Sequence, residues 1–456
     1  MLAADTPGAW HESVGSSTTG PISDLGDWWL GIADPALSSL VGTALDSNTD
    51  VQQASAALEQ AIALRDGAAA GLSPSLGYTA SAQRNFNGDG SAVNNLQAGF
   101  NAGWTPDLFG AQQRTLDAGN ANVQAVLAKW ASVQGSVASA VALNYIVLRS
   151  SQIRWAIAQQ NLAAQQDTLQ IAQWRNQAGL IGGIEVEQAQ VAMLQTRTQL
   201  SPLEQTIARA MHALAVQTGR PPAAFSEWLA EPMPVPLGSA NLQLLSPAAT
   251  LQARPDVRAA QYRVTGAAAD VGQAQARRYP TLHLGANLGV GAASAAALSG
   301  SSALLAGVAI SLAGPLLDGG AVEAQVGAAK ALLLQARASY RGTQLAALQE
   351  VEDALVSLRT DIARAAQLQD VVAAADRAAQ MARQQFASGL VDFQIVLETQ
   401  RSQYAAQDSK ALANANVSSD QVRLYAALGG GWKPVPARMA VDPRIPSKTA
   451  ALPPTQ

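Results

Sequence analysis

The chain has 456 residues, of which 14% are charged and 5% are aromatic, and its formal net charge is -4 at pH 7. This balance and a sequence pI near 5.5 exclude the basic surface that a nucleic-acid-binding protein needs, so we expect no nucleic acid among its partners. The chain has no cysteine, which excludes disulfide bonds, thiol catalysis and cysteine-ligated zinc.

Residues 1–30 are expected to form an extended N-terminal segment. Their start, MLAADTPGAWHES, lacks the basic and apolar regions of a signal peptide, so either the chain is cytoplasmic or a signal has been removed. We expect no helical membrane span, because no continuous apolar run reaches the roughly 18 to 20 residues that a span needs. The nearest, ALLAGVAISLAGPLL at 303–317, is too short and contains Ser, Gly and Pro.

Four stretches of about ten residues alternate apolar residues with Gly, Asn, Ser, Thr or Gln, the pattern of a strand with one apolar face. They predict strands at 76–86, 94–104, 281–291 and 303–312. The members of each pair are separated by a loop rich in small and polar residues, NGDGSAVN in the first pair and AASAAALSGSS in the second. Each pair is therefore predicted to form a hairpin.

Two long helices are predicted where proline is absent, over 110–177 and 320–387. Apolar residues recur in them at the seven-residue spacing of a packed seam, as Val123, Trp130 and Val137 do in the first helix. At 1.5 Å per residue, each helix is expected to be on the order of 100 Å long.

The predicted elements lie in a duplicated frame. Three pairs of segments match in the same order at offsets of roughly 206 to 210 residues: PSLGYTA with PTLHLGA, DLFGAQQR with LLDGGAVE, and AGLIGGIEVEQAQ with SGLVDFQIVLETQ. We therefore expect a first repeat over 31–220 and a second over 246–428, each composed of a helix, a hairpin, a long helix, a turn and a helix. A Pro-rich equatorial linker at 221–245 joins the repeats, and a flexible tail follows at 429–456.

The alternation of the strands is typical of a transmembrane β-barrel, in which the apolar face contacts lipid and the polar face lines the lumen. A strand packed on a soluble core shows a similar pattern, but here the second face is mostly small or polar, as a wet lumen requires. Trp104 stands at a strand end, where aromatic residues collect at the membrane interface. Four strands cannot close a barrel, since the smallest single-chain barrels use about eight. We therefore expect a homotrimer with a twelve-stranded barrel.

The chain resembles the TolC-type outer-membrane efflux channels, particularly their multidrug and heavy-metal efflux branch, from about Leu25 to Leu428. The resemblance rests on the Asp34-Pro35 pair ahead of an Ala- and Leu-rich helix, on DLFG after the second strand, and on the paired AGL and SGL turns. It implies a mainly α fold with a membrane β-barrel, in which a trimeric twelve-stranded barrel stands on an α-helical barrel that extends into the periplasm. The implied location is the outer membrane of a Gram-negative bacterium.

The resemblance also implies a function and partners. Members of the family serve as the exit duct of a tripartite pump and passively conduct drugs or other small toxic compounds, together with a periplasmic adaptor and an inner-membrane transporter. A type I protein secretion duct of the same fold and a soluble elongated helical scaffold remain alternatives. Many relatives carry a lipidated N-terminal cysteine, which this sequence lacks, so either the chain was trimmed or its barrel alone anchors it.

The helix turns carry the candidate functional residues. The long helices are expected to end at Gly179 and Gly389, whose lack of a Cβ suits a left-handed turn, and the tips formed with Leu180 and Leu390 are the expected adaptor contacts. Just after the second tip, Glu398 occupies the position of the acidic residue in the leucine-leucine-aspartate-alanine-glutamine-arginine pattern of the family, which lines the periplasmic constriction.

Gln394 lies four residues before Glu398, so the two side chains share one face of a helix. Three copies of this pair are expected to form the periplasmic gate, although a merely solvated helix face is the alternative. Gln394 stands where the family commonly has leucine, which places a hydrophobic ring at that level in doubt. Near the first tip, Gly182 and Gly183 replace the more usual polar and apolar pair.

The sequence favours no enzyme. Its three histidines, His11, His212 and His283, have no second histidine at metal-ligand spacing. The segment GVGAAS resembles part of a dinucleotide-binding fingerprint, but a loop follows it rather than a phosphate-binding helix. We therefore expect no catalytic residues, no metal and no cofactor.

Overall fold

A computed structural model describes residues 7–12, 25–86, 88, 90, 92–238, 244–300 and 303–432 of the chain. The chain divides into two compact units. Unit 1 takes its described residues from Met1–Ser55, Lys129–Val257 and Gln344–Gln456, and unit 2 comes from Ala56–Ala128 and Arg258–Thr343.

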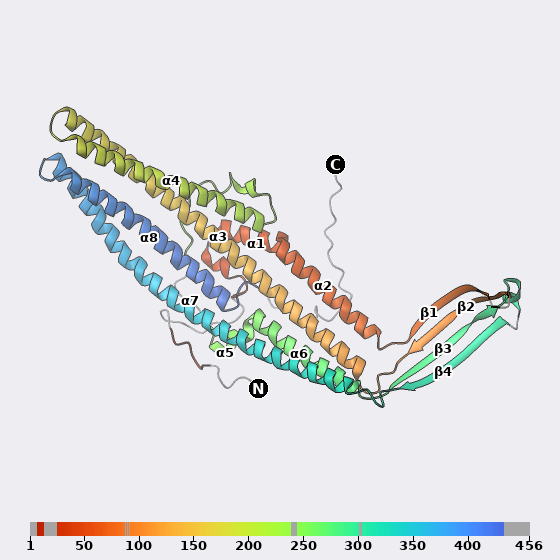
Figure 1. Cartoon of the computed structure of the whole chain (residues 1–456). Coiled ribbons are helices and arrows are strands. Elements are labelled where there is room, and N and C mark those ends of the chain that lie inside the picture. Colours follow the sequence, from red (N-terminus) through yellow and green to blue (C-terminus); the bar gives the residue numbers. More distant parts are fainter. Residues whose placement is uncertain are drawn as a thin grey trace. The chain divides into compact units, whose positions relative to one another are not determined.

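Three of the four helices in each half of the chain have a counterpart of equal length in the other half, and Figure 1 shows the same order of helices in both halves. The first half has α1 (Pro35–Ser47), α2 (Thr49–Ala70), α3 (Ala111–Gln177) and α4 (Gly183–Gln217), and the second has α5 (Pro247–Ala253), α6 (Pro255–Ala276), α7 (Ala321–Ala387) and α8 (Phe393–Ala427). Helices α2 and α6 have 22 residues each, α3 and α7 have 67, and α4 and α8 have 35. The duplicated helical frame predicted from the sequence is therefore confirmed.

The four predicted strands are observed within two residues of the expected positions. They are β1 (Ser75–Phe86), β2 (Ala92–Trp104), β3 (Thr281–Ala292) and β4 (Leu304–Ala313), and every neighbouring pair is antiparallel in the order β1-β2-β3-β4. A short 3-10 helix, η4 (Ala296–Ser299), lies between β3 and β4. All four strands belong to unit 2.

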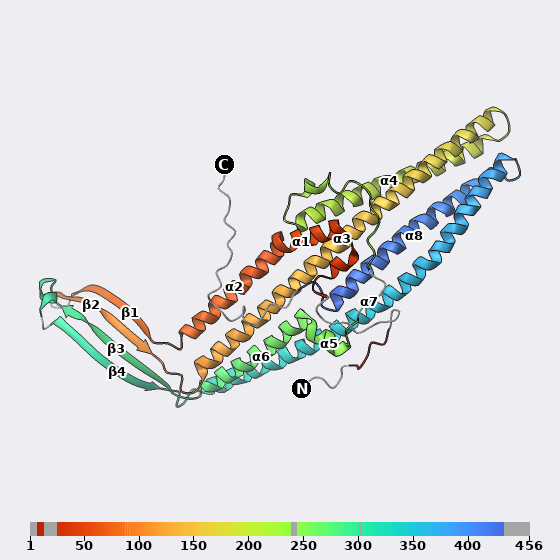
Figure 2. The same cartoon turned by 180° about the vertical axis from the view of Figure 1, so that it is seen from behind.

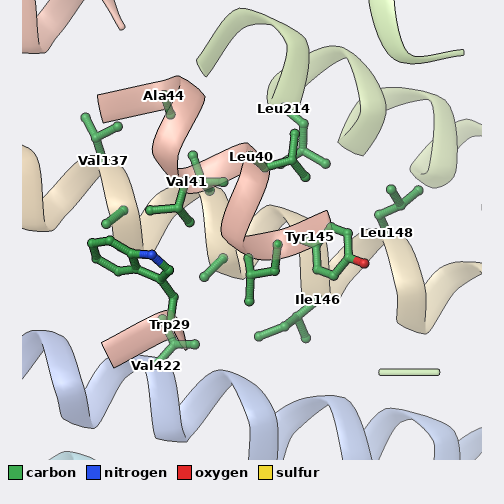
Figure 3. Packing of buried hydrophobic residues seen from close by; sticks show 14 of the residues in the cluster. Trp29, Leu40, Val41, Ala44, Val137, Tyr145, Ile146, Leu148, Leu214 and Val422 are labelled. Carbon is green, nitrogen blue, oxygen red and sulfur yellow. The ribbon is translucent and has the colours of Figure 1, made fainter. Parts of the chain in front are cut away.

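The main core of unit 1 surrounds α1, which lies between α3, α4 and α8 (Figure 3). Pro35 begins α1, and the carboxylate of Asp34 caps it by accepting hydrogen bonds from the backbone N–H groups of Ala36 and Leu37 at 2.9 and 3.0 Å. Apolar residues of α1 then recur every three or four positions and are fully buried: Leu37, Leu40, Val41 and Ala44. The Asp-Pro pair thus fixes where α1 enters the core.

The segment before α1 corrects one expectation. Residues 1–30 were predicted to be extended, but Trp28–Ile32 form the 3-10 helix η2, in which Trp28, Trp29 and Ile32 are buried. Trp28 stacks on Tyr425 of α8 with ring centroids 5.4 Å apart. Burial of the two indole side chains therefore accounts for the packing of this segment in the core. The prediction of an extended segment is wrong for residues 28–30.

The linker and the tail are described only in part. The linker at 221–245 contains the 3-10 helix η3 (Pro222–Phe225), and its last two residues, Leu244 and Leu245, pack into a second buried cluster with α7 and α8. At the start of the tail, a Cβ added to Gly430 would lie 2.9 Å from the carbonyl oxygen of Leu25. Residues 433–456, which hold the rest of the predicted tail, lie outside the described residues.

One described helix is long and apolar enough to cross a membrane by length and composition. An 18-residue window of α3 has a mean hydropathy of 1.4, although α3 has no continuous apolar run of that length. More than half of this window, 56%, is buried inside the structure. Buried residues of α3 between Val137 and Leu148 belong to the core around α1: Val137, Ala138, Val141, Ala142, Tyr145, Ile146 and Leu148. Packing into this core accounts for the apolar character of that part of α3.

Candidate functional site

Both long helices end in the same hydrogen-bonded turn. After α3, the backbone N–H of Gly179 donates to Asn176 at 2.9 Å and that of Leu180 donates to Arg175 at 2.8 Å. Gly179 has φ +72, a left-handed conformation that favours glycine. This pattern is a Schellman motif. It leaves the side chain of Leu180 70% exposed at the tip.

The turn after α7 repeats this geometry. Gly389 has φ +75, its N–H donates to Phe386 at 3.0 Å, and the N–H of Leu390 donates to Gln385 at 2.9 Å. Leu390 is 74% exposed. The two predicted helix ends are thus observed, and Leu180 and Leu390 are both exposed. Figure 2 shows the turns between α3 and α4 and between α7 and α8, which form the two tips of unit 1.

A buried cluster joins the two helical hairpins just behind their tips. Its members come from α3, α4, α7 and α8: Ala172, Ala189, Ala192, Ala382, Phe386, Phe393, Val396 and Leu397. Arg175 of α3 reaches across this junction, because its guanidinium lies 4.1 Å from the ring centre of Phe386 and donates to the carbonyl oxygen of Ala387 at 3.2 Å. The four helices therefore hold the two tips in a defined arrangement.

The predicted gate residues lie on the opposite face of α8 from this cluster. Phe393, Val396 and Leu397 are buried, whereas Gln394 and Glu398 are both exposed. Because they are four residues apart, their side chains lie one above the other on the free face of the helix. The structure thus brings the two residues together and leaves their face open.

A shallow groove lies beside this face. It has a volume of about 520 Å³ and is lined by Arg401 of α8 together with residues of the first turns of α4, among them Ile184 and Glu187. Ile184 is 73% exposed. When the segments after the two tips are aligned, position 187 of α4 matches an early position of α8. The first repeat therefore also has an exposed carboxylate near its tip, that of Glu187.

The sheet separates its polar and apolar residues as predicted. Cross-strand neighbours share parity, so Gly77 pairs with Asn101 and Tyr78 pairs with Phe100. On the polar face, the amide of Asn101 donates to Thr79 Oγ1 at 3.1 Å. On the apolar face, the large residues are exposed, with Tyr78 and Val308 both at 83%. An exposed apolar sheet face of this size requires an apolar solvent such as lipid.

Aromatic residues mark the end of the sheet that joins the helices. Trp104, the predicted interface residue, ends β2, and its indole N–H donates to the carbonyl oxygen of Leu72 at 3.1 Å. Phe109 and Tyr279 stack nearby with ring centroids 4.7 Å apart, and both are about half exposed. The sequence analysis missed this second pair. The sequence could have indicated this pair, because each of the two aromatic residues lies within five positions of the end of a predicted strand.

Polar contacts between α3 and α8 were also missed. They occur at seven-residue steps along α3 and join it to α8 across more than 200 residues of sequence: Thr168 with Gln400 at 2.9 Å, Asn161 with Gln407 at 3.2 Å, and Arg154 with Asp408 at 2.7 and 3.0 Å. Burial raises the pKa of the Tyr404 hydroxyl beside this row, and the charge of Asp408 adds to the effect. The row extends the interface of α3 and α8 from the core toward the tips.

The sequence profile of the family described as outer membrane efflux protein matches residues 40–220 and 247–430. The chain belongs to this family. OpmQ of Pseudomonas aeruginosa, a pyoverdine export outer membrane protein, is 30% identical over 425 residues, which are 90% of this chain and 88% of that protein. Nodulation protein T of Rhizobium leguminosarum bv. viciae is 29% identical over 427 residues, 93% of this chain and 87% of that protein.

Solved structures agree with this assignment. The outer-membrane channel OprN superimposes with a TM-score of 0.86 at 30% identity, covering 94% of this chain and 98% of OprN. The outer membrane protein VceC from Vibrio cholerae gives a TM-score of 0.82 at 25% identity, covering 90% of this chain and 99% of VceC. The resemblance to TolC-type channels and the predicted fold class are thus confirmed. The protein is an outer-membrane exit duct for efflux in a Gram-negative bacterium.

Among the residues that the structure describes, no group of three or more His, Asp or Glu side chains could hold a metal ion. The single described histidine of the sheet, His283, instead has its Nδ1 3.2 Å from Thr105 Oγ1 on the polar face. The family is one of channels.

Proposed function

We propose that three copies of the chain form the duct and that a ring of Gln394 and Glu398 closes its periplasmic end. The protein then works without catalysis, cofactor or metal. The observation that carries the proposal is the free polar face of α8 beside the tip, because Gln394 and Glu398 are exposed while the opposite face of the helix is buried. A three-fold axis along this face brings three amides next to three carboxylates.

Such a ring is polar and attracts cations, and like charges at close range raise the cost of ionising all three carboxylates. Opening requires the α7–α8 hairpins to move away from the axis. The exposed tips, Gly179 with Leu180 and Gly389 with Leu390, are the proposed contacts of a periplasmic adaptor, which supplies the differential binding energy for this movement. An inner-membrane transporter completes the pump.

The proposed cargo consists of small organic compounds. Relatives are named for pyoverdine export and for toluene efflux, the latter in Pseudomonas putida at 27% identity. The chemical range of these two compounds favours a duct that makes few specific contacts. The same two names favour a small-molecule efflux duct over the alternative of a protein secretion duct.

Conductance in planar bilayers tests the gate. Glu398→Gln, which removes the charge and keeps the shape, should weaken cation preference, and Glu398→Ala combined with Gln394→Ala should also raise conductance. Glu187→Ala removes a carboxylate near the first tip and serves as the matched control, for which a smaller effect is expected. Unchanged conductance and selectivity in the double variant, with the trimer intact, would place the constriction elsewhere and make the Glu398 face a merely solvated one.

A further inference from the structure

The lipid-facing side of the sheet is not uniform, because it contains an apolar groove of about 530 Å³ within unit 2. Small residues, Ala80 and Ala98, lie at its base. Larger ones border it: Tyr78, Phe100, Leu288 and Leu304. All six belong to the apolar parity of the strands. We call this feature the acyl groove.

The strand register explains the shape of the acyl groove. Ala80 pairs with Ala98 and Ala98 pairs with Val290, which gives a row of small and medium side chains across three strands. The next row toward the helices contains the aromatic pair Tyr78 and Phe100. A low row of side chains beside a tall row leaves a furrow, and its apolar lining is complementary to a hydrocarbon chain.

Two glycines of the inner parity, Gly99 and Gly289, also line the furrow. Gly99 and Gly289 are opposite each other on the inner parity, and a Cβ on Gly99 would lie 2.8 Å from the Cα of Gly289. A Cβ on Gly289 would lie 2.5 Å from the carbonyl oxygen of Ala98. Only glycine permits this close approach of β2 and β3. The backbones of β2 and β3 therefore approach each other closely on the inner face, at the level of the acyl groove.

A positively charged side chain, that of Arg84, lies on the same face of the sheet, between the acyl groove and the hairpin loop. Arg84 shares the parity of Ala80 and follows it by four residues, a distance of about 13 Å along a strand. Its guanidinium carbon lies 5.4 Å from the ring centre of Phe86, and Asn94 is its cross-strand neighbour. These residues are near the hairpin loop, at the end of the sheet remote from the helices.

The position of Arg84 in the sheet indicates which leaflet of the membrane the lipid bound there would come from. The helices of this family extend into the periplasm, so the loop end of the hairpin is at the outer surface. An arginine on a lipid-facing strand is costly near the bilayer midplane and is tolerated near the interface. There its planar donors can bind a phosphate group in a bidentate manner.

We propose that the acyl groove and Arg84 together bind one phosphorylated lipid of the outer leaflet on each protomer. The acyl chain lies over Ala80 and Ala98, and the phosphate is held by Arg84, with the amide of Asn94 beside it. This site is independent of the gate and of the cargo. The barrel then holds a specifically bound lipid in addition to the bulk lipids that exchange around it.

Native mass spectrometry of the delipidated trimer tests the site. The probes are lipid A with its phosphates, the same lipid after dephosphorylation, and phosphatidylethanolamine. The wild type should bind up to three phosphorylated molecules per trimer, in preference to the other two probes. Ala98→Leu fills the acyl groove and Arg84→Gln removes the phosphate ligand, so each should weaken binding of the phosphorylated lipid about tenfold.

Two matched controls separate the site from general lipid contact. Ala102→Leu makes the same change on the same strand and face, four residues away, and Lys330→Gln removes an exposed positive charge outside the sheet. Both should bind like the wild type. If Ala98→Leu fails to assemble, Ala80→Leu fills the groove from β1.

Three results would overturn the proposal: equal loss in Ala98→Leu and Ala102→Leu, unchanged binding in Arg84→Gln, or equal binding of the phosphorylated and dephosphorylated lipids. Binding of a copurifying protein at this face in place of lipid would also overturn it. Bilayer conductance of the same variants should remain at the wild-type level. A loss of conductance would instead indicate a defective duct.

Discussion

A single carboxylate, that of Asp34, connects the start of α1 to the middle of α3. One oxygen caps α1, and the other accepts a hydrogen bond of 2.9 Å from the hydroxyl of Tyr145, a fully buried side chain. Arg149 lies over the same ring at 4.9 Å and donates to the carbonyl oxygen of Glu231 at 2.7 Å. Asp34, the Tyr145 hydroxyl and one terminal nitrogen of Arg149 thus have hydrogen-bond partners, which limits the cost of removing these groups from water.

Asp420 of α8 is less well compensated. Its side chain is 2% exposed, and one oxygen accepts from Arg423 at 2.9 Å, while the other has no hydrogen-bond partner among the described residues. Burial raises the pKa of the Asp420 carboxyl above its ordinary value of 3.8, Arg423 opposes this effect, and the nearby Asp361 adds to it. The folded protein therefore favours the protonated form.

We predict that ionisation of the Asp420 carboxyl lowers the free energy of unfolding as the pH rises. Below its unfolded pKa the group is protonated in both states, so its stabilising contribution is fully present, and this contribution is lost as the pH rises through the raised folded pKa. The side chain introduced by Asp420→Asn cannot ionise. At pH 7 the free energy of unfolding of this variant should therefore exceed that of the wild type by on the order of 1 kcal/mol. The advantage should shrink toward pH 4.

Circular dichroism during thermal unfolding in detergent, at several pH values, measures this difference. Asp392→Asn is the control, because Asp392 is an exposed residue at the start of the same helix. Parallel pH profiles for the wild type and Asp420→Asn would show that the burial of Asp420 has no energetic consequence.

At the scale of elements, the strands are governed by which face each residue presents. Phe100 and Asn101 are neighbours in β2, a central strand with partners on both sides, and they belong to opposite parities. Phe100→Arg places a charge in the apolar part of the bilayer and should cost roughly 2 to 4 kcal/mol near the midplane, whereas Asn101→Arg faces the lumen and should cost little.

Urea unfolding of the protein refolded into vesicles measures both variants. Their positions differ by a single residue, so each serves as the control for the other. Equal destabilisation by the two substitutions would be incompatible with a lipid-facing and a lumen-facing side of the sheet.

Local patterns were sufficient to predict the strands and the long helices. The alternation in residues 94–104 fixes the face of each side chain, and Gly179 and Gly389 mark helix ends because only glycine adopts their backbone conformation readily. The predicted gate pair, Gln394 and Glu398, followed from helical spacing and from the family pattern. Its exposed face is observed, and its role as a gate stays a prediction.

Contacts between distant segments could not be predicted in this way. The hydrogen bond of Tyr145 to Asp34 and the ion pair of Arg154 with Asp408 join residues 111 and 254 positions apart. Nothing near Arg154 in the sequence indicates which carboxylate it meets. The same limitation explains the error at Trp28, whose partner Tyr425 lies at the other end of the chain.

At the scale of the whole molecule, the sheet is incomplete by itself. Strands β1 and β4 have one neighbour each in the order β1-β2-β3-β4, so both expose unpaired backbone groups at their outer edges. Backbone groups without partners are costly in lipid, and a barrel avoids them only by closing. In the proposed ring of three protomers, we expect β4 of one copy to pair with β1 of the next, antiparallel like every other pair in the sheet.

Engineered disulfides can detect this edge pairing, because the sequence has no native cysteine to interfere. We predict that Thr79→Cys in β1, combined in turn with Gly307→Cys, Ala309→Cys or Ser311→Cys in β4, forms a disulfide between protomers in at least one register. All four positions lie on the lumen parity. Within one protomer, β1 and β4 are separated by two strands, roughly 14 Å at 4.8 Å per step, whereas a disulfide needs Cα atoms about 4.4 to 6.8 Å apart.

Non-reducing electrophoresis should therefore show a ladder of the 47.0 kDa chain that ends at the covalent trimer and collapses to the monomer under reduction. Thr79→Cys alone provides the control, and it should give no trimer. A ladder that ends at two copies, or continues beyond three, would assign the barrel a different number of strands. If none of the three pairs crosslinks although the detergent-solubilised protein has the mass of a trimer, β1 and β4 are not the strands that close the barrel.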